Sequence, residues 1–250
     1  MDNTKALSYL RSKFPFQPEI GLLDYTATPL FEKELKVEIR IPYSDIPYFT
    51  NTENIHGELI LGSIDRFKVL VFRNHFKPEN ANHHGVSFPI EVMSHFGVAS
   101  VLLIIEALSI YQSPGPEILI ANDHFRLFHS LPAAAVSGIP PKVASNIYPP
   151  EFVDTAKTQA QKLGLRIPDG MICDGMGIGL VSNAEYEYLR TCGISAIGSF
   201  FAADAEAAYQ HGIPLLAMAL LHEKDQVQKQ GVTALNKELR NLILGIISSL

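Results

Sequence analysis

The sequence predicts a three-layer α/β fold in which a mixed, mostly parallel β-sheet is flanked by helices. Short apolar runs bounded by turn residues recur along the 250-residue chain, and segments with helical features lie between them. The composition, 47% hydrophobic and 18% charged, is typical of a globular protein. A single α/β domain of this length is ordinary, so we expect one domain over residues 1–250.

Nine apolar runs are the expected strands. Their near-continuous hydrophobicity is typical of strands that are covered on both faces. They are EIGLL (19–23), KVEIRI (36–41), GELILG (57–62), FKVLVF (67–72), SVLLII (100–105), EILIA (117–121), GMIC (170–173), SAIG (195–198) and PLLAMALL (214–221).

Five segments have the features of helices. Three of them, 86–97, 182–193 and 204–212, end on Gly97, Gly193 and Gly212, which is the usual place for glycine after a helix. The segment 149–164 opens on prolines and ends on a fourth glycine, Gly164. Ser182 and Asn183 are possible N-terminal caps for the segment 182–193. The last helix is expected from about residue 227 to the end, since apolar residues recur there at the helical period.

The bulk properties exclude several classes of function. The net charge of −6 and the absence of a Lys/Arg cluster argue against nucleic-acid binding. The apolar stretches are too short or too charged to span a bilayer, and the N-terminus lacks the apolar core of a signal peptide. Cys173 and Cys192 both stand among apolar residues, so we expect two buried, reduced thiols in a cytoplasmic protein.

Strand-end loops are where such folds bind ligands, and one of them is unusually polar. VFRNHFKPENANHHG (71–85) contains Arg73 and His75, which can present two donors to one anion. His83 and His84 are adjacent and would point apart on an extended segment, so we expect no metal site. The alternative to an anion site is that this segment is a solvated surface loop.

Two further motifs have a structural interpretation. DGMGIG (174–179) lacks the spacing of a dinucleotide-binding or P-loop fingerprint, which favours a tight turn. NDHF (122–125) places Asp123 beside His124, but chain neighbours seldom form a catalytic dyad, so a structural turn is expected. Composition and spacing alone give no decisive catalytic signature.

The order of several segments resembles the trimeric purine nucleoside phosphorylases, from about Pro18 to the end of the chain. Each segment is a weak signal alone, but six in the right order at near-family spacing are fairly specific. They are IPYSDIPYF (41–49), HGELILG (56–62), VSFPIEVMSHFGVASVLLI (86–104), EILIANDHFRL (117–127), NAEYEYLRTCGISAIG (183–198) and the C-terminal helix.

The resemblance implies the family's fold, a homotrimer and the phosphate-dependent cleavage of purine nucleosides to base and pentose 1-phosphate. Phosphate would be a co-substrate, and no cofactor or metal is implied. By resemblance, the phosphate-binding candidates are Thr26 in the first loop, His56 before a glycine, and Arg73 with His75 as a clamp. The last two assignments require a one-residue gap in the alignment.

This sequence departs from the family at most of the remaining motifs. The glycines of the first phosphate loop are replaced over residues 25–28, and Glu106 enters a motif that lines the phosphate pocket. At about 4 Å and an effective dielectric near 20, one like-charge pair costs about 4 kcal/mol. In the base and ribose pocket, the family's motif residues are replaced by Leu180, Val181, Ser199, Phe200, His222 and Glu223.

Three hypotheses follow from the resemblance and the departures. The leading one is a purine nucleoside phosphorylase-like protein with weak or no family activity, acting in binding or assembly as a homotrimer or with a relative. The second is a repurposed, nucleoside hydrolase-like enzyme in which Glu106, Glu223, Asp204 and His222 lie on strand-end loops that converge, with Glu106, Glu223 and His222 as the catalytic residues. The third is a working purine nucleoside phosphorylase with a misaligned or altered site. All three imply a purine nucleoside or base as ligand.

Overall fold

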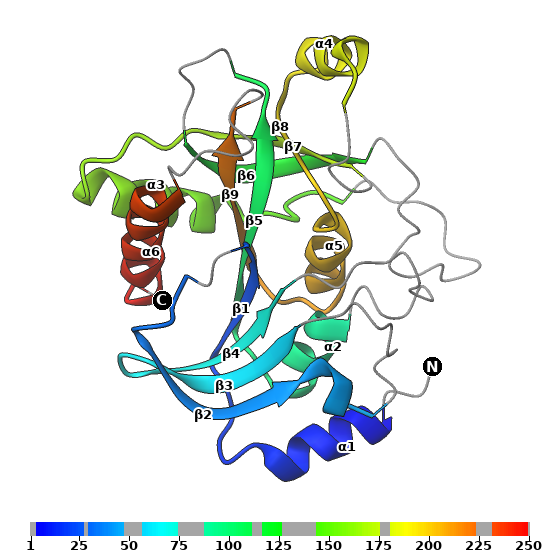
Figure 1. The fold of residues 1–250 in the computed structure, drawn as a ribbon, viewed down its shortest axis with the longest axis vertical. Coiled ribbons are helices and arrows are strands. Elements are labelled where there is room, and N and C mark those ends of the chain that lie inside the picture. Colours follow the sequence, from blue (N-terminus) through cyan, green and yellow to red (C-terminus); the bar gives the residue numbers. More distant parts are fainter. Residues whose placement is uncertain are drawn as a thin grey trace.

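The computed structural model describes residues 4–27, 30–47, 57–74, 88–111, 117–126, 144–175, 181–223 and 232–249. Their strands form one mixed sheet that is curved strongly at one end (Figure 1). The strands are β1 (Ile20–Tyr25), β2 (Leu35–Pro42), β3 (Glu58–Ile64), β4 (Phe67–Arg73), β5 (Ser100–Ser109), β6 (Ile118–Arg126), β7 (Asp169–Asp174), β8 (Ile194–Gly198) and β9 (Leu215–His222). Each of the nine predicted runs overlaps one of these strands.

The sheet has the order β2-β3-β4-β1-β5-β8-β7-β6-β9, and β9 also pairs with β5. Strands β5, β8, β7, β6 and β9 therefore form a closed ring, and β2, β3, β4 and β1 extend from it through the pairing of β1 with β5. Five of the nine pairings are parallel and four are antiparallel. The mixed, mostly parallel sheet is confirmed, but the sequence did not predict that it closes.

Helices cover both faces of the sheet, as Figure 1 shows. Helices α1, α2 and α5 lie on one face, and α3 and α6 lie on the other. Helix α4 packs near β7 and β8 through Leu189. The helices are α1 (Thr4–Lys13), α2 (Phe88–His95), α3 (Pro150–Lys162), α4 (Asn183–Thr191), α5 (Ala202–Gln210) and α6 (Val232–Ile247), with a short 3-10 helix η1 (Tyr43–Asp45).

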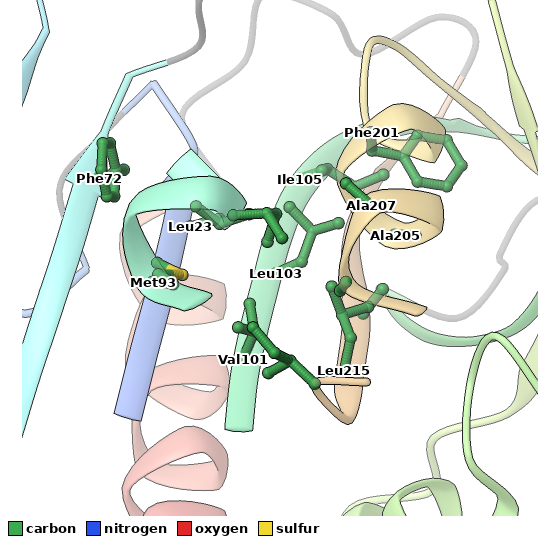
Figure 2. Close-up of a cluster of buried hydrophobic side chains, with 14 of the residues drawn as sticks. Leu23, Phe72, Met93, Val101, Leu103, Ile105, Phe201, Ala205, Ala207 and Leu215 are labelled. Atoms are coloured by element: carbon green, nitrogen blue, oxygen red, sulfur yellow. The ribbon is translucent and has the colours of Figure 1, made fainter. Parts of the chain in front are cut away.

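The central strands bury alternate residues in two separate cores because successive side chains of a strand point to opposite faces. Strand β5 contributes Val101, Leu103 and Ile105 to the core under α2 and α5, where Figure 2 shows them beside Met93 and Leu215. The intervening residues of β5 join the core under α3 and α6. Continuous apolar runs are thus explained by burial on both sides.

The predicted helix ends are confirmed. Gly97, Gly164, Gly193 and Gly212 have φ of +71°, +72°, +78° and +68°, the left-handed conformation that favours glycine after a helix. Ser182 caps α4 in a capping box: its hydroxyl accepts a hydrogen bond from the Glu185 amide, and the Glu185 carboxylate accepts one from the Ser182 amide.

The helices differ from the prediction at the two ends of the chain. Helix α1 has no predicted counterpart, and α6 is described only from Val232 onward. The expectation of two buried thiols is wrong for Cys192, which is exposed because it follows the solvent-facing end of α4, while Cys173 is buried in β7. The NDHF segment is not a turn, since β6 continues through it to Arg126 with an irregularity in its pairing with β7 after Ala121.

Candidate functional site

The carboxyl ends of the parallel strands β1, β4, β5 and β9 meet at one edge of the sheet, which is the expected place for a ligand. The antiparallel strand β3 begins there, so Glu58 is the pairing partner of Arg73. Asp24 of β1 is paired with Arg73 on its other side. This register places two carboxyl groups beside one buried guanidinium group.

Arg73 is bound by carboxylates of this chain. Its side chain is 6% exposed, and Nη1 lies 3.0 Å from Oε1 of Glu32 and 3.1 Å from Oε1 of Glu58. Glu58 also pairs with the more exposed Arg40 at 2.8 Å. Nη1 of Arg73 is thus held by two carboxylates at the end of β4, while Nε is buried without a hydrogen-bond partner in the described part of the chain.

The loop that follows β1 is folded around the fully buried Asp24. Oδ1 of Asp24 accepts hydrogen bonds from the Thr26 hydroxyl (2.6 Å) and the Thr26 amide (3.3 Å), and Oδ2 accepts one from the Leu30 amide (3.2 Å). Burial raises the pKa of Asp24, while these hydrogen bonds and the nearby Arg73 act in the opposite direction. Thr26 is itself buried, so its hydroxyl donates inward.

Glu106 and His222 approach each other at the ends of β5 and β9. His222 Nε2 lies 3.5 Å from Oε2 of Glu106, and the Ala27 amide donates to Oε1 of Glu106 at 2.9 Å. The contact with His222 is the main cause that lowers the pKa of Glu106, and the Ala27 amide adds to it against partial burial. Both side chains are about a quarter exposed, but Nε2 of His222 is itself inaccessible to solvent and makes no hydrogen bond within the described residues.

Another carboxylate occupies the start of α5. Oδ1 of Asp174, the last residue of β7, accepts from the Phe200 amide at 2.7 Å, and Oδ2 accepts from the Ala202 amide at 3.0 Å. Phe200 has φ of +59°, a left-handed conformation that is uncommon for a bulky residue. Amides at a helix N-terminus form an anion site, and here a side chain of the same chain fills it.

On the α5 face of the sheet, Tyr25 and Asp204 join β1 to the first turn of α5. The Tyr25 hydroxyl donates to Oδ2 of Asp204 at 2.9 Å. Asp204 is 1% exposed, and burial raises its pKa well above the ordinary aspartate value, with Asp174 adding to the shift and the Tyr25 hydrogen bond opposing it. Burial is also the first cause of the raised pKa of Tyr25.

A separate polar cluster surrounds His124 in β6. Nδ1 of His124 lies 2.9 Å from the Tyr148 hydroxyl and Nε2 lies 3.2 Å from Oε1 of Glu206 on α5, which also pairs with Arg126. His124 does not pair with its neighbour Asp123 through the side chains; the Asp123 carboxylate accepts from the His124 backbone amide. This cluster ties β6 to α5 and is separate from the Glu106–His222 pair.

The structure brings together some of the predicted site residues. Thr26 and Arg73 lie on adjacent strand ends, each bonded to carboxylates, and Glu106 faces His222. Glu223 follows β9 at the same edge. His56, His75, Leu180 and the His83–His84 pair lie outside the described residues, as does most of DGMGIG.

The predicted base-pocket residues lie in different parts of the structure. Val181 packs against the small core of α4, β7 and β8. Ser199 and Phe200 lead into α5, where the Ser199 hydroxyl is buried and has no hydrogen-bond partner in the described part of the chain. The residue before them, Gly198, lies close to β5, because a Cβ built on it would be 2.8 Å from Cδ1 of Ile105.

Sequence reasoning missed the carboxyl groups that organise this edge: Asp24, Glu32, Glu58 and Asp174. Two of them were signalled by position, since Asp24 and Asp174 each come at the end of an apolar strand run (GLLD and MICD). An acidic residue in such a place is buried with the strand and needs hydrogen-bond donors. Glu32 and Glu58 carried no comparable signal.

No three or more His, Cys, Asp or Glu side chains among the described residues are placed to hold a metal ion. In the same residues, no helix is long and apolar enough to cross a membrane.

Curated relatives are similar over most of the chain. Purine nucleoside phosphorylase 1 of Geobacillus stearothermophilus is 27% identical over 87% of this chain and 82% of its own length. Purine nucleoside phosphorylase 1 of Bacillus subtilis is 23% identical over 87% of this chain and 83% of its own length.

Solved structures share the fold. A crystal structure of Schistosoma mansoni purine nucleoside phosphorylase with a monocyclic inhibitor has a TM-score of 0.83 at 23% identity, covering 99% of this chain and 96% of that one. A purine nucleoside phosphorylase in complex with ribose-1-phosphate has a TM-score of 0.84 at 22% identity. Residues 25–246 match the model of the phosphorylase superfamily. The resemblance seen in the sequence is therefore confirmed, and this chain belongs to the phosphorylase superfamily.

Proposed function

We propose that this purine nucleoside phosphorylase-like chain binds a purine nucleoside or base, and that it cleaves nucleosides with phosphate slowly or not at all. One observation carries the proposal: carboxylates of the chain itself occupy the groups that would otherwise bind phosphate. Glu32 and Glu58 bind Arg73, Asp24 binds the hydroxyl and amide of Thr26, and Asp174 binds the amides at the start of α5.

The energetic consequence follows from charge and from hydrogen-bond donors. A phosphate ion placed beside Glu106 or Glu58 meets a like charge, at a cost of about 4 kcal/mol per pair at ~4 Å. Removing one donor that stabilises a developing anion costs 2.7–4 kcal/mol in enzymes, roughly a hundred- to a thousandfold in rate. Several donors are engaged here at once, and although such losses are not additive, slow phosphorolysis is the expected result.

The same proposal covers the assembly and location of the protein. We expect a homotrimer, or a mixed oligomer with an active relative, since the chain keeps the superfamily fold over nearly its whole length. We also expect a cytoplasmic location, where the free thiols of Cys173 and Cys192 would stay reduced. Light scattering of the purified protein measures the first expectation directly.

The Glu106–His222 pair supports a second candidate function, hydrolysis of the glycosidic bond. The partly exposed carboxylate of Glu106, which lies beside the imidazole of His222, can take a proton from water as the water oxygen bonds to the anomeric carbon. The base would leave with the electron pair of the broken bond. Glu223, at the same edge of the sheet, is a second carboxylate that could take part in this hydrolysis.

Base release from inosine, guanosine and adenosine, measured with and without phosphate, separates these functions. The proposal predicts little or no turnover in either condition, together with a nucleoside-dependent rise in melting temperature through mass action. Phosphate-dependent turnover at an ordinary rate of about 1–1,000 per second would overturn it and identify a working phosphorylase. Turnover that is independent of phosphate and is lost in Glu106→Gln would favour hydrolysis.

A second experiment tests whether carboxylates hold Arg73 away from phosphate. In the double variant Glu32→Gln, Glu58→Gln, the guanidinium group loses both anionic partners, so inorganic phosphate should bind at least tenfold more tightly than to the wild type. The double variant Glu38→Gln, Asp154→Asn, at exposed positions of β2 and α3, is the matched control for the change in net charge. Equal phosphate affinity in the double variant and the control would contradict this account of the site.

A further inference from the structure

Two polar atoms near the start of α5 are buried without hydrogen bonds. Oγ of Ser199 and Oδ1 of Asp204 are inaccessible to solvent and have no hydrogen-bond partner in the part of the chain that the structure describes. Buried polar atoms are nearly always paired in native proteins, and each exception calls for an explanation. A ligand that supplies the missing partner is one such explanation.

Asp204 has the position of a ligand-contacting residue. It lies in the first turn of α5 and is 1% exposed, and Tyr25 at the end of β1 donates to its Oδ2 at 2.9 Å. Ligands of open α/β sheets bind outside the carboxyl ends of the strands. One oxygen of Asp204 is therefore fixed by Tyr25 at the end of β1, and the other is left without a partner within the described residues.

The surroundings of Asp204 favour its neutral form. The groups that interact with it are two phenols, Tyr25 from β1 and Tyr43 from η1, and a second carboxylate, Asp174 from β7. Burial, the largest cause, raises the pKa of Asp204 well above its ordinary value. A protonated carboxyl has one donor and can accept on its other oxygen. Since Oδ2 accepts from Tyr25, the proton belongs on Oδ1.

We propose that Asp204 is a specificity-determining residue that donates a hydrogen bond from Oδ1 to an acceptor atom of the bound ligand, a carbonyl oxygen or an unprotonated ring nitrogen of a heterocycle. The inference rests on the proposed binding function and names the ligand chemistry of that site. Ser199 lies five residues earlier, and its hydroxyl is likewise buried without a hydrogen-bond partner in the part of the chain that the structure describes.

The substitution Asp204→Asn reproduces the neutral acid. The amide oxygen accepts from Tyr25 and the amide nitrogen donates to the ligand. We therefore expect the affinity for inosine and hypoxanthine, measured by isothermal titration calorimetry at pH 7, to stay within about threefold of the wild type. Asp204→Leu removes the donor and should weaken binding at least thirtyfold. Asp154→Asn, an exposed position on α3, is the control.

The outcomes distinguish the inference from the proposed function. A tenfold or greater loss in Asp204→Asn would mean that an ionised Asp204 accepts a hydrogen bond, which overturns the inference, as would unchanged binding in Asp204→Leu. If wild-type protein binds neither inosine nor hypoxanthine at millimolar concentration, the proposed function fails and the inference fails with it. Binding by the wild type that no Asp204 variant alters would overturn the inference alone.

An infrared measurement does not depend on whether the leucine variant folds. The wild type at pH 7 should show the carbonyl band of a protonated carboxyl that is missing in Asp204→Asn, and inosine should shift this band. A band that is absent at pH 7, or that inosine leaves unmoved, would contradict the role assigned to Asp204. Raising the pH should weaken inosine binding to the wild type but not to Asp204→Asn, because only the acid can lose its proton.

Discussion

At the scale of single residues, the candidate site is defined by buried charges and by the partners that neutralise them. Arg73 is almost fully buried at the end of β4, and its partners come from β3 and from the segment before β2. The segment that holds Arg73 could be identified from the sequence as a polar strand-end loop. Its carboxylate partners could not, because Glu32 and Glu58 are 41 and 15 positions away in the chain.

Removal of the charge on Arg73 should destabilise the fold. In Arg73→Gln, Glu32 and the nearby Asp24 lose their cationic neighbour and Glu58 keeps only Arg40, and breaking a buried pair costs about 3 kcal/mol or more. Denaturation in urea should show this loss in the free energy of unfolding. The exposed Lys33→Gln is the matched control for lost positive charge and should stay within about 0.5 kcal/mol of the wild type. A loss below 1 kcal/mol in Arg73→Gln would show that the ion pairs contribute little.

At the scale of elements, the sequence placed strands and helix ends well because those signals are local. Apolar runs, the Ser182 cap and the four helix-terminating glycines depend on residues within a turn or two of each other. Helix α1 gave only a weak signal, with two fully buried residues in ten, Ala6 and Leu10. The conformation of the loop after β1 depends on hydrogen bonds to both Asp24 and Glu106. Glu106, which accepts from the Ala27 amide, is 79 positions away from Ala27 in the chain.

Two glycine substitutions separate tertiary packing from local conformation. A Cβ at Gly62 of β3 overlaps the carbonyl oxygen of Lys36 on β2, so Gly62→Ala should cost about 3 kcal/mol through the shift it forces on the strand pair. A Cβ at Gly164 meets no atom within 4 Å, so Gly164→Ala should cost only the strain of its left-handed backbone, about 1 kcal/mol. Chemical denaturation checks both values. A larger loss in Gly164→Ala than in Gly62→Ala would contradict this order.

At the scale of the whole molecule, closure of the sheet leaves few exposed edges. Within the described strands, β9 pairs back onto β5, so β2 is the free edge at the other end of the order. Strand β2 carries exposed charges on Lys36, Glu38 and Arg40, ends on Pro42 and has an irregular register after Val37. Charges, proline and bulges on an edge strand discourage pairing with another chain.

Replacing the charges of this edge should promote aggregation without unfolding. In Lys36→Val, Glu38→Val, the rate of aggregation on heating, followed by light scattering, should rise several-fold because the edge gains β-propensity and loses charge. The free energy of unfolding should change by less than about 0.5 kcal/mol. Lys237→Val, Glu238→Val makes the same chemical change on exposed positions of α6. Equal aggregation of the two double variants would rule out a protective role for the edge.

The sequence by itself determined the α/β class, all nine strands, most helix ends and the superfamily resemblance, because each depends on local periodicity or on the order of short motifs. It also located the strand ends at which Thr26, Arg73 and His222 lie. Only the tertiary structure decided the closed ring of strands, the pairing of Glu106 with His222 and the burial of Asp204 against Tyr25. These features join residues far apart in the chain, and the partners, charge state and exposure of a side chain exist only once the strands are brought together.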